Sequence, residues 1–124
     1  MTHKTTADIH AWLEHMSTWP EGWNGYNALP PKAEALAHTE RWLNEIIPLL
    51  GERWLPVNIT AGGQGDVACS WSYGVYTLEA ILDGLTIDCM KVWGRDVNCL
   101  ITDAGVETHE DFVLLWNWLL EENA

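Results

Sequence analysis

Two carboxylates, Glu79 and Asp88, come nearest to a chemical site in this sequence. They flank Asp83-Gly84, a dipeptide typical of a two-residue β-hairpin turn, because both turn positions require positive φ. A two-residue loop places Glu79 directly opposite Asp88, and like charges in that position destabilise an isolated hairpin. The same register predicts an apolar opposite face that pairs Leu82 with Leu85, Ala80 with Ile87 and Leu78 with Cys89.

Three interpretations of the carboxylate pair remain open. The charges are solvated or relieved by a neighbouring Lys91 or Arg95; or they belong to an acidic face that receives a lysine or arginine from a partner; or they form a metal site or catalytic dyad in which one pKa is raised. No histidine or serine stands at a telling spacing from the pair. The catalytic interpretation therefore ranks last.

The cysteines and histidines show no spacing typical of a metal or nucleophile site. Cys69, Cys89 and Cys99 alternate with polar residues, so we expect them on an inward face, where a free cysteine behaves as a small hydrophobe. The histidines lie in or near the expected helices: His3, His10, His15, His38 and His109. We therefore expect no enzyme, no cofactor and no metal. The odd cysteine count and the lack of a signal peptide favour a reducing, cytoplasmic compartment.

The charge balance is strongly acidic. Eighteen Asp and Glu face six Lys and Arg, which leaves a formal net charge of −12. Such a surface repels nucleic-acid phosphates and anionic membranes, and it attracts basic partners over long range. The alternative is that the acidity only keeps a protein with nine tryptophans in solution. No apolar run approaches the roughly 20 residues of a membrane span.

The loop between Trp19 and Pro31 carries candidate contact residues. Trp23 and Tyr26 either plug the gap between helices and sheet, or present aromatic rings to a partner. Near the C-terminus, the expected helix is apolar beyond the stripe around Leu115. It is therefore either central in the fold, or it meets another chain in a homodimer.

The hydrophobic periodicity predicts three helices. The first is capped by Thr5 or Thr6 and ends at Trp19-Pro20. The second begins near Pro31, should kink or stop near Pro48, and has Gly51 as its terminus. The third follows a capping-box-like pair, Thr108 and Asp111.

Between the second and third helices the periodicity changes to two, which predicts strands. The expected strand ranges are 57–60, 67–72, 75–82, 85–93 and 97–102. A chain of 124 residues is long enough for one domain, 1–124. We predict the α+β class: an antiparallel β-meander of 4–5 strands packed by helices, in the order α-α-β-β-β-β-β-α.

A resemblance extends from about Trp19 to Leu100. It rests on the segment Gly22-Trp23-Asn24-Gly25-Tyr26-Asn27-Ala28 with Pro30, which is followed by a helix, a Gly-rich turn and a strand ending in Trp71. This arrangement resembles short uncharacterised bacterial and phage proteins that share a Trp-Asp-Gly-Tyr-Gly-Ala loop. This chain has Asn24 and Asn27 where that pattern shows Asp and Gly. The resemblance implies a bacterial or phage origin.

These observations lead to a hypothesis of a non-enzymatic acidic binding protein. It would occupy a basic site on a protein partner, for example nucleic-acid-handling machinery, as inhibitors, immunity proteins or phage anti-defence proteins such as anti-CRISPRs do. Glu79 and Asp88 would supply charge, and Trp23 and Tyr26 would anchor the partner. The alternatives are a structural or assembly subunit that acts through homo-oligomer contacts, and a carboxylate-based enzyme of unfamiliar type.

Overall fold

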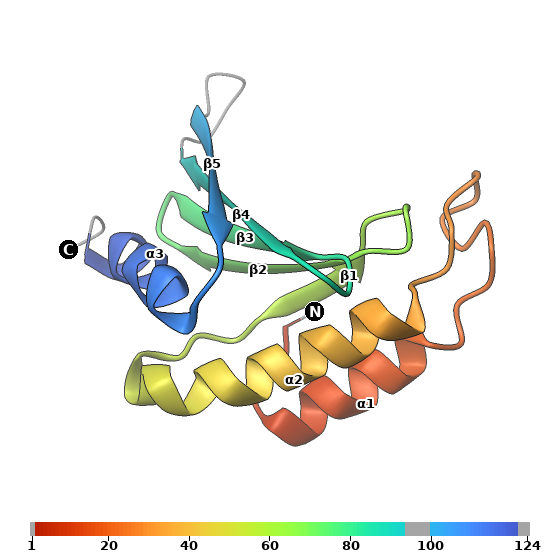
Figure 1. Ribbon diagram of the computed structural model, residues 1–124, viewed down its shortest axis with the longest axis horizontal. Coiled ribbons are helices and arrows are strands. Elements are labelled where there is room, and N and C mark those ends of the chain that lie inside the picture. The colour runs from red at the N-terminus through yellow and green to blue at the C-terminus, as the bar shows by residue number, and fades with distance from the viewer. Residues whose placement is uncertain (1, 94–99, 122–124) are drawn as a thin grey trace.

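The computed structural model describes residues 2–93 and 100–121 and has three α-helices and one antiparallel sheet (Figure 1). In chain order the elements are α1 (Thr6–Met16), α2 (Ala33–Leu50), a short 3₁₀ helix (Gly51–Arg53), β1 (Asn58–Ala61), β2 (Val67–Tyr73), β3 (Tyr76–Leu82), β4 (Ile87–Trp93), β5 (Leu100–Val106) and α3 (His109–Glu121). The strands lie in the order β1-β2-β3-β4-β5, each antiparallel to its neighbour. The α+β class with a helix-packed antiparallel sheet is confirmed. Cys99 and the predicted turn at 94–96 lie outside the described residues.

Local signals define the ends of the helices. Thr5 caps α1 by accepting the amide of Asp8 at 3.1 Å. Thr108 and Asp111 form the predicted reciprocal cap of α3: the hydroxyl accepts the Asp111 amide at 3.2 Å, and the carboxylate accepts the Thr108 amide at 3.1 Å. Both caps satisfy amides that a helix start otherwise leaves unpaired.

The second helix passes through its proline. Pro48 lies inside α2, which ends at Leu50. A proline this near the C-terminus removes a single hydrogen bond and leaves little helix beyond it to disrupt. Gly51, at φ +55°, then ends the helix in a conformation that glycine adopts readily.

The β3–β4 loop is longer than predicted. Leu82 pairs with Ile87, so the connection has four residues, 83–86. The Asp83 carboxylate holds this loop by accepting the amides of Leu85 and Thr86, each at 2.8 Å. The two-residue Asp83-Gly84 turn is therefore wrong, because a side chain that can accept both amides favours the wider turn.

The longer loop moves the register of β4 by two positions. Glu79 pairs with Met90, and Asp88 pairs with Ile81, so the predicted direct opposition of Glu79 and Asp88 is wrong. A shift of two keeps the side chains of β4 on their predicted faces, because the side-chain period of a strand is two. Leu85 is the exception: it was predicted on the apolar face opposite Leu82, but it lies in the longer loop and is 90% exposed. Cys89 accordingly lies on the buried face, opposite Ala80.

Tryptophans fill the core between the helices and one face of the sheet. Trp71 of β2 is 1% exposed and lies at the centre, with ring centroids 6.2 Å from Trp42, 5.9 Å from Trp54, 5.4 Å from Phe112 and 5.5 Å from Trp116. These rings come from α2, the segment after it, and α3. The helices α2 and α3 are therefore held against the same face, and in the described part of the chain no helix packs on the opposite face of the sheet (Figure 1).

Candidate functional site

The outer face of the sheet brings together the two predicted carboxylates. This outer sheet face is formed by the alternate residues of β2, β3 and β4 that point away from the helices: Ala68, Ser70, Ser72, Thr77, Glu79, Ile81, Asp88, Met90 and Val92. Glu79 and Asp88 are diagonal neighbours on it, at a separation of about 7–8 Å for such positions. The wider spacing lowers the repulsion between the two carboxylates relative to direct opposition.

Apolar side chains lie between these carboxylates. Ile81 is opposite Asp88 and Met90 is opposite Glu79, while Val92 extends the apolar strip along β4. All three are half-buried, and Asp88 is exposed. A partly exposed apolar strip with a carboxylate on either side is a surface that a cationic and partly apolar partner would complement.

Few carboxylates are neutralised within the protein. Among residues 2–93 and 106–120, the ion pairs join a histidine to a glutamate: His10 to Glu14 at 2.9 Å, His10 to Glu40 at 2.6 Å, and His109 to Glu45 at 2.8 Å. Within those ranges no lysine or arginine is paired with a carboxylate. Glu40, and then Glu14, raise the pKa of His10 above its ordinary value. The acidic excess thus stays largely uncompensated on the described surface.

The two predicted aromatic anchors have different environments. Trp23 is half-buried, lies 5.0 Å from the Trp19 ring, and donates its indole N–H to the Leu29 carbonyl at 2.8 Å. Tyr26 is 82% exposed at the tip of the same loop. Trp23 therefore closes the loop, whereas the Tyr26 ring is available for contact. The loop is fastened to the β1–β2 turn through Leu29 and Gly63, at the sheet edge away from β4, so the structure does not bring it to Glu79 and Asp88.

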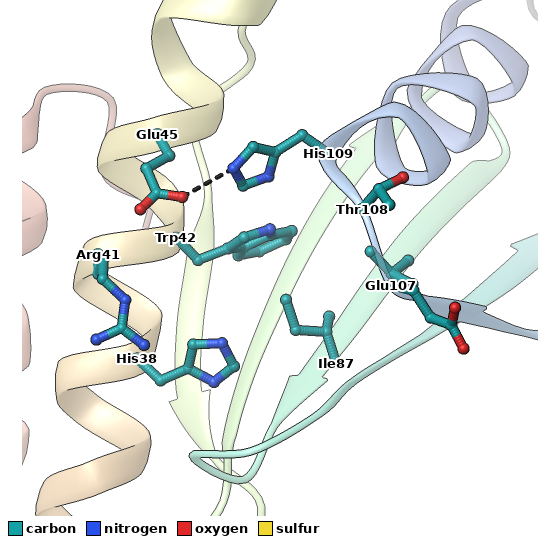
Figure 2. Close-up of a pocket in the computed structure, with 9 residues that line it drawn as sticks. His38, Arg41, Trp42, Glu45, Ile87, Glu107, Thr108 and His109 are labelled. Atoms are coloured by element: carbon teal, nitrogen blue, oxygen red, sulfur yellow. Dashed lines mark hydrogen bonds and ion pairs between the residues drawn. The ribbon is translucent and has the colours of Figure 1, made fainter.

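A second candidate site lies on the helical side of the sheet (Figure 2). It is a hollow of about 400 Å³ between α2, the start of β4 and the start of α3, which we call the α2–α3 groove. A neighbouring hollow of about 420 Å³ shares His38, Ile87, Val106 and Glu107 with it and extends toward the β3–β4 loop. The first hollow is within the volume range of small-molecule sites.

One wall of the groove comes from a single helix face. His38, Arg41, Trp42 and Glu45 have the spacing i, i+3, i+4, i+7, which places them in a row on α2. On the other side, Glu107, Thr108 and His109 line the approach to α3. The His109 Nε2 and a Glu45 carboxylate oxygen lie 2.8 Å apart and tie the two helices together at one end, as Figure 2 shows.

Two polar atoms in the groove have no partner. The indole Nε1 of Trp42 and the Nδ1 of His38 are buried without a hydrogen bond among the described residues. Burial, and then the charge of Arg41, lower the pKa of His38 below its ordinary value of 6.5. The His38 ring is therefore mostly neutral at pH 7, and Arg41 is the cation of this wall.

The sequence does not predict this groove, because the residues that form its walls are far apart along the chain. His38 and His109 are both in the expected helices, and no local motif relates them. The available signal was the row on α2, where a histidine, an arginine and a glutamate share a helix face with a tryptophan. In the part of the chain that the structure describes, no cluster of three or more His, Cys, Asp or Glu could hold a metal ion.

The chain matches no protein-family model, no curated protein and no solved structure. Among the described helices, none is long and apolar enough to cross a membrane.

Proposed function

We propose that this protein is a non-enzymatic acidic binding protein that occupies a basic site on a protein partner. The observation that carries the proposal is the outer sheet face, where Glu79 and Asp88 form no ion pair with a described lysine or arginine and enclose a half-buried apolar strip. The partner supplies lysine or arginine side chains, whose aliphatic stems cover the strip while their charged ends reach the carboxylates. A basic site on nucleic-acid-handling machinery has this chemistry, so an inhibitor, immunity or phage anti-defence role, such as that of an anti-CRISPR, fits the surface.

The net charge of the protein and the apolar area of the outer sheet face contribute differently to partner binding. The formal net charge of −12 speeds encounter with a cationic partner and makes association sensitive to salt. Ile81, Met90 and Val92 provide the area from which water is removed on binding. Tyr26, at 82% exposure, is a further contact residue if the partner reaches the loop edge.

The other two classes of function have weaker support. A homodimer through α3 needs a wide free apolar surface. The main apolar residues of this helix are instead buried within the chain: Phe112, Leu115, Trp116 and Leu119. Among its described residues, Leu114, at 68% exposure, is the large apolar side chain that is exposed. For a carboxylate enzyme, Glu79 and Asp88 would need to face one cleft. Asp88 lines the hollow beside the α2–α3 groove, and Glu79 does not.

The test compares two variants of equal charge. The face variant is Glu79→Gln with Asp88→Asn, and the control variant is Glu21→Gln with Glu110→Gln, which changes two exposed carboxylates outside the outer sheet face. Each immobilised protein is used to capture partners from the native host extract at low and at high salt. We expect a basic protein that the wild type and the control variant retain at low salt, that high salt releases, and that the face variant fails to hold.

Two results would count against the proposal. One is capture of the same basic protein by the face variant, which would mean that the outer sheet face is not the contact. The other is capture of no basic protein by the wild type at low salt. Sedimentation of the wild type alone separates the assembly alternative, because an assembly subunit forms a stable homo-oligomer.

A further inference from the structure

The α2–α3 groove contains hydrogen-bonding atoms that the protein itself does not satisfy. Trp42 is 3% exposed, and its Nε1–H has no acceptor among the described residues. Four buried side-chain atoms in those residues lack a partner, and two of them, Trp42 Nε1 and His38 Nδ1, belong to residues that line this one hollow. Buried polar atoms are normally paired, so a ligand group that pairs with them would suit this hollow.

The unpaired atoms specify the chemistry of that group. An indole N–H can only donate, and so can the guanidinium of Arg41, which lines the same wall and is in no ion pair with a described residue. Figure 2 shows the Trp42 ring reaching into the hollow from α2, with Arg41 and His38 following along the helix. The ligand must therefore bring acceptor oxygens, and a negative charge suits the arginine.

The remainder of the groove limits the size and charge of the ligand. Its volume of about 400 Å³ leaves room for more than a bare anion, and Trp42, Ile87 and Val106 give it apolar walls. Glu107 stands across from Arg41, and the whole protein carries a formal charge of −12. Both repel a doubly charged anion more than a singly charged one.

We propose that the α2–α3 groove binds a small organic monocarboxylate. The carboxylate accepts hydrogen bonds from Trp42 Nε1 and from the Arg41 guanidinium, and its apolar body lies against Ile87 and Val106. This site is on the helical side of the sheet and is independent of the outer sheet face. An experiment can therefore refute binding of a basic partner at the outer sheet face without refuting carboxylate binding in the groove, and the opposite result is also possible.

The test follows the indole N–H signal of Trp42 by ¹⁵N-edited NMR, with the signal assigned from Trp42→Phe. The probes are sodium benzoate, sodium acetate and inorganic phosphate, each added at constant ionic strength against sodium chloride. We expect benzoate to shift the Trp42 signal saturably, acetate to do so more weakly, and phosphate to match chloride. The Trp54 indole, already bonded to the Lys4 carbonyl at 2.9 Å, should not move and is the internal reference.

Matched arginine variants test the proposed contact. Arg41→Gln should weaken benzoate binding about tenfold, as expected for losing a charge-assisted hydrogen bond. Arg53→Gln should leave benzoate binding unchanged, because Arg53 is also exposed but donates to Asn117 outside the groove. The proposal is overturned if benzoate gives no saturable shift, if phosphate binds as well as benzoate, or if Arg41→Gln binds benzoate as the wild type does.

Discussion

Replacing Trp71 with phenylalanine should destabilise the protein less than the same replacement at Trp116. The two indoles are nearly equal in burial, at 1% and 0% exposed, and their ring centroids lie 5.5 Å apart in one aromatic cluster. They differ in their polar atom. Trp116 donates its Nε1–H to the Arg53 carbonyl at 3.2 Å, whereas Trp71 Nε1 is buried without a partner among the described residues.

The difference between the two variants can be estimated from this one atom. Both lose the same indole volume, so the cavity contributions largely cancel. Trp116→Phe loses a hydrogen bond worth about 0.5–1.5 kcal/mol and leaves a carbonyl unpaired. Trp71→Phe removes an unpaired donor whose burial costs about 1–3 kcal/mol, which offsets part of its cavity cost. Because the two effects act in the same direction, we expect Trp71→Phe to be the more stable variant by about 1.5–4.5 kcal/mol.

Urea unfolding followed by far-UV circular dichroism measures this difference without relying on tryptophan fluorescence. With a urea dependence of about 2 kcal/mol per molar, the midpoints should differ by roughly 1–2 M. Trp54→Phe is the control: Trp54 is 7% exposed and donates to the Lys4 carbonyl at 2.9 Å, so it should behave like Trp116→Phe. Equal midpoints, or a lower midpoint for Trp71→Phe, would refute the reasoning that the unpaired indole nitrogen is costly.

Two further expectations concern thiol reactivity and acid stability. Burial raises the pKa of Cys69 above its usual range and that of Cys89 to about 12. Both thiols should therefore resist alkylation by iodoacetamide at pH 8 in the folded protein and react only on unfolding. Peptide mass spectrometry measures this, and rapid alkylation of either thiol in the folded protein would contradict their burial. The amides of Thr86 and Leu85 lower the pKa of Asp83 below its ordinary 3.8. Because this pKa is lower in the folded state, the ionised Asp83 stabilises the fold above pH 3.8, and this stabilisation is lost as the pH falls through the folded pKa. Asp83→Asn should therefore flatten the acid limb of a curve of unfolding free energy against pH. An unchanged slope would show that the loop does not need the charge.

Elements with local signals were predictable from the sequence. The caps at Thr5 and at Thr108 with Asp111 depend on residues within one turn of each other, and both are confirmed. The alternation that predicted Cys69 and Cys89 on the buried face survived even where the register was wrong. A period of two determines the face, but it does not determine the partner.

The β3–β4 register and the groove were beyond this local reasoning. Asp83-Gly84 suited a two-residue turn by residue type, but the Asp83 carboxylate could also bind the amides of Leu85 and Thr86, and that competition decides the register. His38 and His109 acquire a shared site only when α2 and α3 are packed against the same sheet face.

The sequence by itself determined the acidity, the caps at Thr5 and Thr108, and the inward face of most strand residues, because charge is a sum over residues and periodicity acts over a few neighbours. Tertiary structure alone decided that Glu79 and Asp88 are diagonal neighbours on an uncovered sheet face, and that Arg41 and Trp42 face Glu107 across a hollow. These relations join segments far apart in the chain. They depend on how the tryptophan core sets the helices against the sheet, which no short stretch of sequence encodes.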